Sequence, residues 1–152
     1  MADFDFQVGV WRVEHRKLRG RLSGSTDWAV FEGRCTAWTV MGGEGSVEDQ
    51  FLDDPDGPYR AAAFRRRDPV SGVWSIWWFD GRSSGLEPPV LGRFENGVGV
   101  FLCDDELEGR PIQVRFIWSE ITHDSARWEQ AFSADGGLTW EVNWIMQFER
   151  TE

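Results

Sequence analysis

The sequence contains few of the residues on which metal centres, disulfide frameworks and membrane spans depend. Its 152 residues include two cysteines, Cys35 and Cys103, and two histidines, His15 and His123. The cysteines lack the spacing of metal ligands and two histidines cannot form a histidine cluster, so we predict no metal and no cofactor. A haem-binding barrel would have to use one of these histidines as its axial ligand. No apolar run approaches the roughly 18 residues of a membrane-spanning helix.

Positive charge is also scarce. Lys and Arg together number 16, of which only Lys17 is lysine, against 26 Asp and Glu, and the formal net charge is -10. A surface of this sign repels nucleic-acid phosphates and anionic lipids, so we predict no nucleic acid and no membrane as partner. The opening residues lack the basic and then apolar plan of a signal peptide. We therefore expect a cytoplasmic protein with reduced cysteines, folded as one domain over residues 1–152.

Large aromatic residues are abundant instead. Ten Trp and eleven Phe accompany a single Tyr, which is more aromatic surface than the core of one such domain requires. We expect these rings to line or cover a wide apolar space. The basic side chains are nearly all arginine, a bias that either reflects a GC-rich genome or supplies guanidinium groups that stack on Trp and bind carboxylates.

Alternation of apolar and polar residues predicts an all-β chain, because no window holds the 3.6-residue period of a helix. We predict about ten strands, at residues 8–15, 28–41, 46–52, 59–67, 73–80, 90–95, 98–103, 111–121, 126–133 and 139–148. Most connections are short, which favours antiparallel neighbours, and closure into an up-and-down β-barrel would remove the exposed sheet edges. A two-sheet sandwich is the alternative.

The same alternation predicts which side chains face the barrel interior. The expected inward residues are Trp11, Val13, His15, Trp74, Ile76, Trp78, Phe116, Trp118, Glu120, Trp128, Gln130, Phe132, Trp140, Trp144, Met146 and Phe148. Thr139, Glu141 and Asn143 are expected to face outward. The parity of the 59–67 strand leaves Arg65 and Arg66 as alternatives for the inward position. Trp77 and Phe79 would lie on the outside, where a two-ring apolar patch favours a homodimer interface.

The motif Gly9-Val10-Trp11, together with Arg150 near the chain end, resembles the signature of lipocalins and the wider calycin superfamily. In that family the Trp closes the base of the barrel and the Arg packs across it. The resemblance favours Arg65 over Arg66 as the inward arginine. The succession of this motif, the Gly42-Gly43-Glu44-Gly45 loop, Asp68-Pro69 and Trp140-Glu141-Val142-Asn143-Trp144 is similar to an uncharacterised family of bacterial lipocalin-like proteins. The resemblance implies a calycin-type barrel with a ligand-binding role.

A further motif, Ser133-Ala134-Asp135-Gly136-Gly137-Leu138-Thr139-Trp140, resembles the Asp-box of sialidase propellers. Physically it is a hairpin device, in which the carboxylate accepts turn N–H groups and the glycines adopt positive φ. A propeller needs repeated blades, and a single copy in this length excludes one. We assign the motif to folding.

The leading functional hypothesis is a barrel that binds a small, largely apolar or aromatic ligand, with carboxylic acids among the candidates. Its expected contacts are Trp78, Trp118, Trp128, Trp144, Arg65, Gln130, His15 and Glu120. The alternative is an isomerase, cyclase or decarboxylase that uses Glu120, Glu129 or His15 as acid or base. A third possibility is a barrel filled by its own side chains that serves as an interaction module. An enclosed, Trp-lined hollow would favour the first two.

Overall fold

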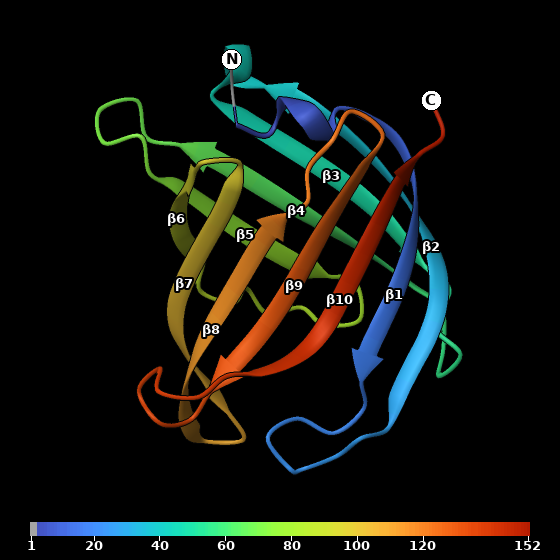
Figure 1. Ribbon diagram of the computed structural model, residues 1–152, viewed down its shortest axis with the longest axis vertical. Helices are drawn as coiled ribbons and strands as arrows, with labels where there is room; N and C mark the ends of the chain where they lie inside the picture. Colours follow the sequence, from blue (N-terminus) through green and yellow to red (C-terminus); the bar gives the residue numbers. More distant parts are fainter. Residues whose placement is uncertain (1–2) are drawn as a thin grey trace.

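The chain forms a closed antiparallel barrel in a computed structural model that describes residues 3–152, and every strand pairs with its sequence neighbours (Figure 1). The ten strands are β1 (Gly9–Leu18), β2 (Trp28–Val40), β3 (Gly45–Leu52), β4 (Tyr59–Arg67), β5 (Trp74–Asp80), β6 (Val90–Glu95), β7 (Val98–Leu107), β8 (Arg110–Ser119), β9 (Ser125–Ser133) and β10 (Glu141–Arg150). β1 pairs with β10 through seven residue pairs, from Trp11↔Arg150 to Lys17↔Trp144, which closes the cylinder. The predicted barrel is confirmed and the sandwich is not formed.

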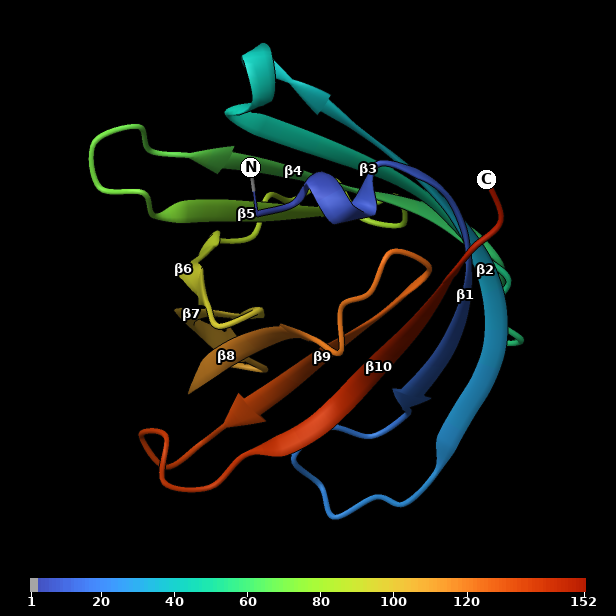
Figure 2. The ribbon, with the colours of Figure 1, turned by 45° about the horizontal axis from the view of Figure 1, so that its top comes forward.

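A short 3-10 helix, η1 (Asp5–Gln7), lies across one end of the barrel, as Figure 2 shows with this end turned forward. Phe4, just before it, is buried and packs edge-on against Trp74, with ring centroids 4.8 Å apart. A second 3-10 helix, η2 (Met41–Gly43), joins β2 to β3. Within residues 3–152 no helix is long and apolar enough to cross a membrane.

The contact implied by the lipocalin resemblance is present at this closed end. The Arg150 guanidinium carbon lies 4.3 Å from the centroid of the Trp11 ring. Its nitrogens also donate to the backbone oxygens of Val8 and Phe6, each at 2.7 Å. Gly9 makes this approach possible, because it adopts φ of 130° and a Cβ there would lie 2.4 Å from Arg150 Nη1.

Two hairpin turns show why β7 is longer than predicted. Asn96 and Gly97, with φ of 52° and 78°, form the two-residue turn between β6 and β7. At the other end, the acidic run 104–107 continues the strand, and the chain reverses only at Glu108 and Gly109, with φ of 51° and 79°. The run remains extended because its residues alternate between the barrel wall and solvent, as strand residues of either polarity can.

The segment with the Asp-box pattern is a structural turn, as expected. Asp135 accepts hydrogen bonds from the backbone N–H of Thr139 at 2.9 Å and from the Ser133 hydroxyl at 2.8 Å. These bonds, those from Thr139 foremost, lower the pKa of Asp135 to about 2. Gly136 and Gly137 adopt positive φ, and the Trp140 indole donates to the Gly137 oxygen at 3.2 Å.

A β-bulge in β10 makes the predicted facing of three residues wrong. The register with β9 shifts between Val142 and Trp144, so Asn143 is an extra residue in the ladder. Asn143 is therefore fully buried rather than outward. Before the bulge the faces are exchanged: Glu141 pairs with the inward Phe132, and Trp140 stacks on Arg115 with the guanidinium carbon 4.4 Å from the ring centroid. Trp140 is thus an outer residue, contrary to the prediction.

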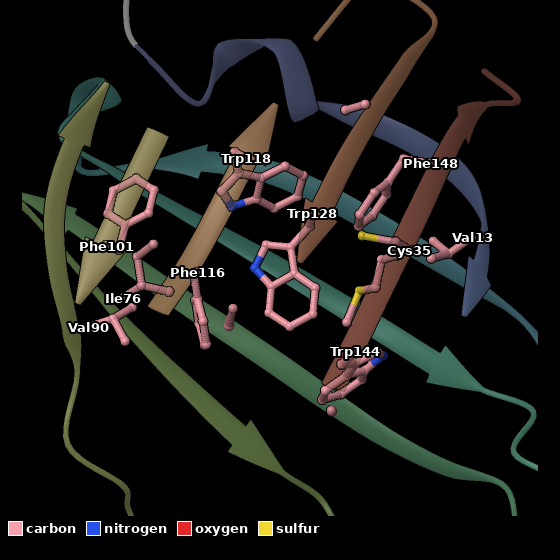
Figure 3. Packing of buried hydrophobic residues seen from close by; sticks show 14 of the residues in the cluster. Val13, Cys35, Ile76, Val90, Phe101, Phe116, Trp118, Trp128, Trp144 and Phe148 are labelled. Atoms are coloured by element: carbon pink, nitrogen blue, oxygen red, sulfur yellow. The ribbon is translucent and has the colours of Figure 1, made fainter. Parts of the chain in front are cut away.

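The closed half of the barrel is packed solid with side chains. Figure 3 shows Trp118 and Phe148 projecting into the space between the strands here, whereas Trp144 and Phe116 belong to the other half. The Trp118 ring contacts those of Phe148 and Phe6, with centroids 5.2 and 5.4 Å away. The hypothesis of a filled barrel therefore holds for this half alone. The other half contains the cavity described below.

Candidate ligand-binding site

The barrel is hollow at the end opposite η1, where a cavity of about 610 Å³ opens to solvent. Its mouth is formed by the β1–β2, β3–β4 and β5–β6 loops and by the hairpin between β7 and β8, several of which project from the lower end of the barrel in Figure 1. This volume falls within the roughly 300–1,000 Å³ of small-molecule pockets.

Aromatic rings form the floor and inner wall of the cavity. Trp78 and Trp144 meet edge to face, with ring centroids 5.6 Å apart. Phe116 and Phe132 add the wall on the β8 and β9 side. The Trp144 indole is held in place from behind, because its Nε1 donates to Nδ1 of His15 at 3.0 Å. A flat apolar molecule that enters the cavity meets rings on several sides.

Gln130 is the neutral polar group in this wall. Its side-chain nitrogen donates to the side-chain oxygen of the bulge residue Asn143 at 2.8 Å. The bulge therefore supplies the hydrogen-bond partner that a buried amide among aromatic rings needs. With one N–H used in this way, the amide oxygen and the second N–H of Gln130 remain to form hydrogen bonds in the cavity.

Two cations in the cavity wall, Lys17 and Arg21, have no carboxylate partner among residues 3–152. The other two lining arginines are paired: Arg19 with Asp27 and Asp56, and Arg82 with Asp80 at 2.7 Å. The guanidinium carbon of Arg21 lies 5.3 Å from the centroid of the Phe132 ring.

The β1–β2 loop is fixed where it presents Arg21 to the cavity. The backbone N–H of Leu22 donates to Glu141 Oε1 at 2.7 Å, a bond that exists because the bulge turns Glu141 inward. At the base of the loop, Arg19 N–H donates to the Asp27 oxygen at 2.9 Å. The loop is therefore tied both to β10 and to itself.

Lys17 lies deeper and is surrounded by rings. Its Nζ is 4.2 Å from the centroid of the Trp144 ring and donates to the Tyr59 hydroxyl at 2.9 Å. Burial, reinforced by the charges of Arg21 and Arg82, lowers the pKa of Lys17 to about 8. This amine is therefore partly neutral at slightly alkaline pH, unlike an exposed lysine.

Acidic side chains stand at the rim. Asp56, Asp80, Glu87, Asp105 and Glu106 line the outer part of the cavity, whereas Asp54, which also lines it, is buried. Asp56 and Asp80 are neutralised by Arg19 and Arg82. The remaining carboxylates make the rim acidic, whereas the two unpaired cations lie in the half-buried wall beneath it.

Arg65 is the inward arginine, as favoured, but it does not reach the cavity. It is 1% exposed, whereas Arg66 is exposed. Its guanidinium pairs with the buried carboxylate of Glu48 and donates to Gln7 and to the Ser46 hydroxyl. Because protein groups already engage both terminal nitrogens of the guanidinium group, Arg65 is not placed to bind a ligand carboxylate.

The carboxylate of Glu48 is the centre of this buried polar network. It also accepts hydrogen bonds from Gln50 at 2.7 Å and from the Cys35 thiol at 3.2 Å. Burial, followed by the charge of Glu48, raises the pKa of Cys35 well above its usual value. Cys35 and Cys103 are both free thiols.

The predicted contact residues divide between the cavity and the layers behind it. Trp78, Trp144 and Gln130 line the cavity. Trp118 and Trp128 lie below the floor, around a void of about 10 Å³ that they share with Arg65.

His15 lies behind Trp144 and does not line the cavity. It is fully buried and stacks on Phe31 with ring centroids 4.8 Å apart. Burial lowers the pKa of His15 to about 3, so the ring is neutral at physiological pH.

The two glutamates proposed as acid or base are also remote from the cavity. Glu120 follows β8 at the closed end with φ of 50°, which turns its side chain into solvent, so its predicted inward position is wrong. Glu129 lies on the outer face of β9 and pairs with Arg127 at 3.2 Å. Among residues 3–152 no group of His, Cys, Asp and Glu is arranged to hold a metal ion.

The cavity wall has its fewest interstrand residue pairs between β5 and β6. Only three residue pairs join these strands, from Trp74↔Gly92 to Ile76↔Val90. Beyond Ile76 the strands separate, and Trp78, Asp80, Arg82, Glu87 and Pro88 line the resulting side of the mouth.

Comparison with known proteins identifies the fold. No protein-family model and no curated protein sequence matches the chain. A solved structure, the S-type phycobiliprotein lyase CPES from Guillardia theta, superposes with a TM-score of 0.58 at 9% identity, covering 98% of this chain and 90% of the lyase. The barrel is lipocalin-like. At this identity the likeness extends to the fold alone.

Sequence reasoning missed Lys17 and Arg21. The inward position of Lys17 could have been predicted, because Lys17 lies two residues after His15 and so shares the strand face of Trp11, Val13 and His15. Arg21 lies in a loop, where alternation gives no information on facing.

Proposed function

We propose that this protein binds a small, largely apolar or aromatic molecule in the open half of its barrel. The observation that carries the proposal is a 610 Å³ cavity whose inner wall presents Trp78, Trp144, Phe116 and Phe132. Burial of a flat apolar body against these rings provides the binding energy, at roughly 25 cal/mol for each Å² removed from water.

We further propose that the ligand is a carboxylic acid, and that Arg21 receives its carboxylate. Arg21 is the half-buried arginine of the wall without a carboxylate partner in the described chain, and the paired Arg19 and Arg82 flank it. A charged hydrogen bond in such a position is worth about 1.5–3 kcal/mol, or roughly a 10- to 150-fold change in affinity.

Tryptophan fluorescence tests both parts of the proposal. The protein is titrated with 1-naphthoate, the neutral 1-naphthalenemethanol and the cationic 1-naphthylmethylamine. We expect saturable quenching by each probe that binds in the cavity, and we expect naphthoate to bind most tightly. Arg21→Gln should weaken naphthoate binding by about tenfold or more while leaving the alcohol within about twofold.

The matched control is Arg34→Gln, which removes an exposed arginine on the outside of β2. It should leave all three affinities unchanged. Absence of saturable quenching by every probe would overturn the binding function. Preference for the amine over naphthoate would overturn the carboxylate assignment and assign ligand selection to the acidic rim.

A homodimer through Trp77 and Phe79 is proposed on the outer apolar face of β5. Phe79 is 44% exposed, and Trp77 lies beside Phe64 with ring centroids 6.3 Å apart. Leu91 and Leu102, 48% and 46% exposed and paired across β6 and β7, continue this apolar surface. Sedimentation velocity at high micromolar concentration should detect a dimer that Trp77→Ser with Phe79→Ser abolishes; a wild-type monomer would contradict the interface.

We also propose a cytoplasmic location and a place among the bacterial lipocalin-like proteins. The first is supported by the two free thiols, which persist in a reducing compartment. The second is supported by the Gly9-Val10-Trp11 motif and its contact with Arg150. Fractionation of the source cells, with thiol labelling of the recovered protein, tests the location.

A further inference from the structure

Lys17 is the sole lysine of the chain, and its amino group lies inside the cavity. It follows the inward His15 on β1 and is paired across the barrel seam with Trp144. The nitrogen is 4.2 Å from the centroid of the Trp144 ring and 5.3 Å from that of Tyr59. A molecule seated against the aromatic floor would therefore meet this amine.

The charged groups around Lys17 leave it without an ion pair. Arg21 from the β1–β2 loop and Arg82 from the β5–β6 loop oppose its protonation, whereas Asp54 and Asp80 favour it less strongly. None of the carboxylates described over residues 3–152 forms an ion pair with it, and His15, the preceding residue on the inward face of β1, is neutral. Burial is the largest cause and lowers the pKa of Lys17 to about 8. At pH 8 about half of the protein molecules therefore have a neutral Lys17 amine with a free electron pair.

The phenol of Tyr59 is in direct contact with the Lys17 amine. The Lys17 amine donates to the phenol oxygen at 2.9 Å, which leaves the phenol O–H to donate elsewhere. Burial raises the pKa of Tyr59 to about 12, and the phenol is therefore protonated throughout the range in which Lys17 is neutral. Amine, phenol and aromatic wall together form a site for carbonyl chemistry.

We propose that Lys17 binds aromatic aldehydes covalently in this cavity, as an imine formed beside Tyr59 and Trp144. The amine electron pair attacks the carbonyl carbon, and the C=O π bond becomes a hydroxyl group. That hydroxyl leaves as water with a proton passed through Tyr59, while the nitrogen loses its protons and forms the C=N bond. One water is released for each imine, and nothing is oxidised or reduced. The proposal rests on the ligand-binding function of the same cavity.

The test uses cinnamaldehyde with sodium cyanoborohydride, which reduces the imine to a stable secondary amine. Intact mass followed by peptide mapping distinguishes Lys17 from the α-amino group of the chain. We expect one adduct at Lys17, inhibited by excess 1-naphthoate because both occupy the cavity. Lys17→Met should abolish this adduct, and Tyr59→Phe should slow its formation at least about fivefold.

A matched control places a lysine outside the barrel. Arg34→Lys in the Lys17→Met background puts an ordinary exposed amine on β2. At pH 7 a pKa near 8 gives a neutral fraction roughly 200- to 300-fold higher than that of an exposed lysine, so wild-type labelling should be at least about tenfold faster than labelling at position 34.

The outcomes separate this inference from the function on which it rests. If naphthoate binds but Lys17 is labelled no faster than the lysine introduced at position 34, covalent capture is wrong and the binding function stands. If neither naphthoate nor any other naphthyl probe binds and Lys17 is unlabelled, both are wrong. Labelling confined to the α-amino group also overturns the assignment to Lys17.

Discussion

Replacing Arg65 by Met should destabilise the barrel severely, although the two side chains are similar in volume and both pack against rings. Arg65 is fully enclosed, with its guanidinium carbon 4.3 Å from the centroid of Phe4. Its loss leaves the carboxylate of Glu48, which is 3% exposed, without a positive charge. Gln50 and Cys35 still donate to Glu48, but hydrogen bonds from neutral groups do not replace an opposite charge in a site closed to water.

The expected loss is about 3–5 kcal/mol of unfolding free energy, the usual result of removing one partner from a buried ion pair. In a domain of this length that corresponds to a fall in Tm of roughly 6–20 °C, at about 2–4 °C for each kcal/mol. Removing both charges, in Arg65→Met with Glu48→Met, should recover part of the loss, because no buried charge then lacks a partner.

Urea denaturation followed by tryptophan fluorescence measures these differences. Arg66→Met is the matched control: Arg66 is the exposed neighbour on the same strand, and its loss should change stability by no more than about 0.5 kcal/mol. A cost below about 1 kcal/mol for Arg65→Met, or a double variant less stable than the single one, would refute the assignment of a charge-balancing role to Arg65.

Two further predictions concern the closed end and the layer behind the cavity. Gly9→Ala should cost about 1–3 kcal/mol in urea denaturation, because φ of 130° is strained for alanine and its Cβ would lie 2.4 Å from Arg150 Nη1; Gly85→Ala, where a Cβ meets nothing within 4 Å, is the control. The pKa of His15 is about 3 in the folded chain, below its usual value of about 6.5, so the neutral ring contributes stability that is present above pH 6.5 and lost as pH falls toward 3. Stability should therefore fall by up to about 1.4 kcal/mol for each pH unit between about 6 and 4, and His15→Gln should remove this part of the slope; an unchanged slope would contradict a buried neutral His15.

The period-two pattern was sufficient to predict the barrel, because each strand buries one face and exposes the other. It predicted ten strands and the inward positions of Trp78, Gln130 and Trp144. It failed where the period is interrupted. The bulge at Asn143 exchanges the faces on either side of it, and no residue of that segment signals a bulge by type.

The predicted site failed for a second reason: alternation shows whether a residue faces inward, but not how far along the barrel axis it lies. Arg65, Trp118 and Trp128 are all inward, yet they belong to the filled half or to the layer under the floor. The distinction depends on the stagger between strands and on η1 entering one end only. The pairing of Arg65 with Glu48 likewise requires the register of β3 with β4, which places Glu48 opposite Ala63, two residues from Arg65.

The brief ladder between β5 and β6 has a mechanical consequence. Three residue pairs are the smallest number at any junction of this cylinder, and they all lie on the side away from the mouth. Outward bending of the residues beyond Ile76 would break no interstrand bond to β6, so this flank is the most compliant part of the circumference. The width of the mouth therefore depends on how far this flank bends, whereas Trp144 on the opposite side of the cavity belongs to a strand that is paired with both of its neighbours.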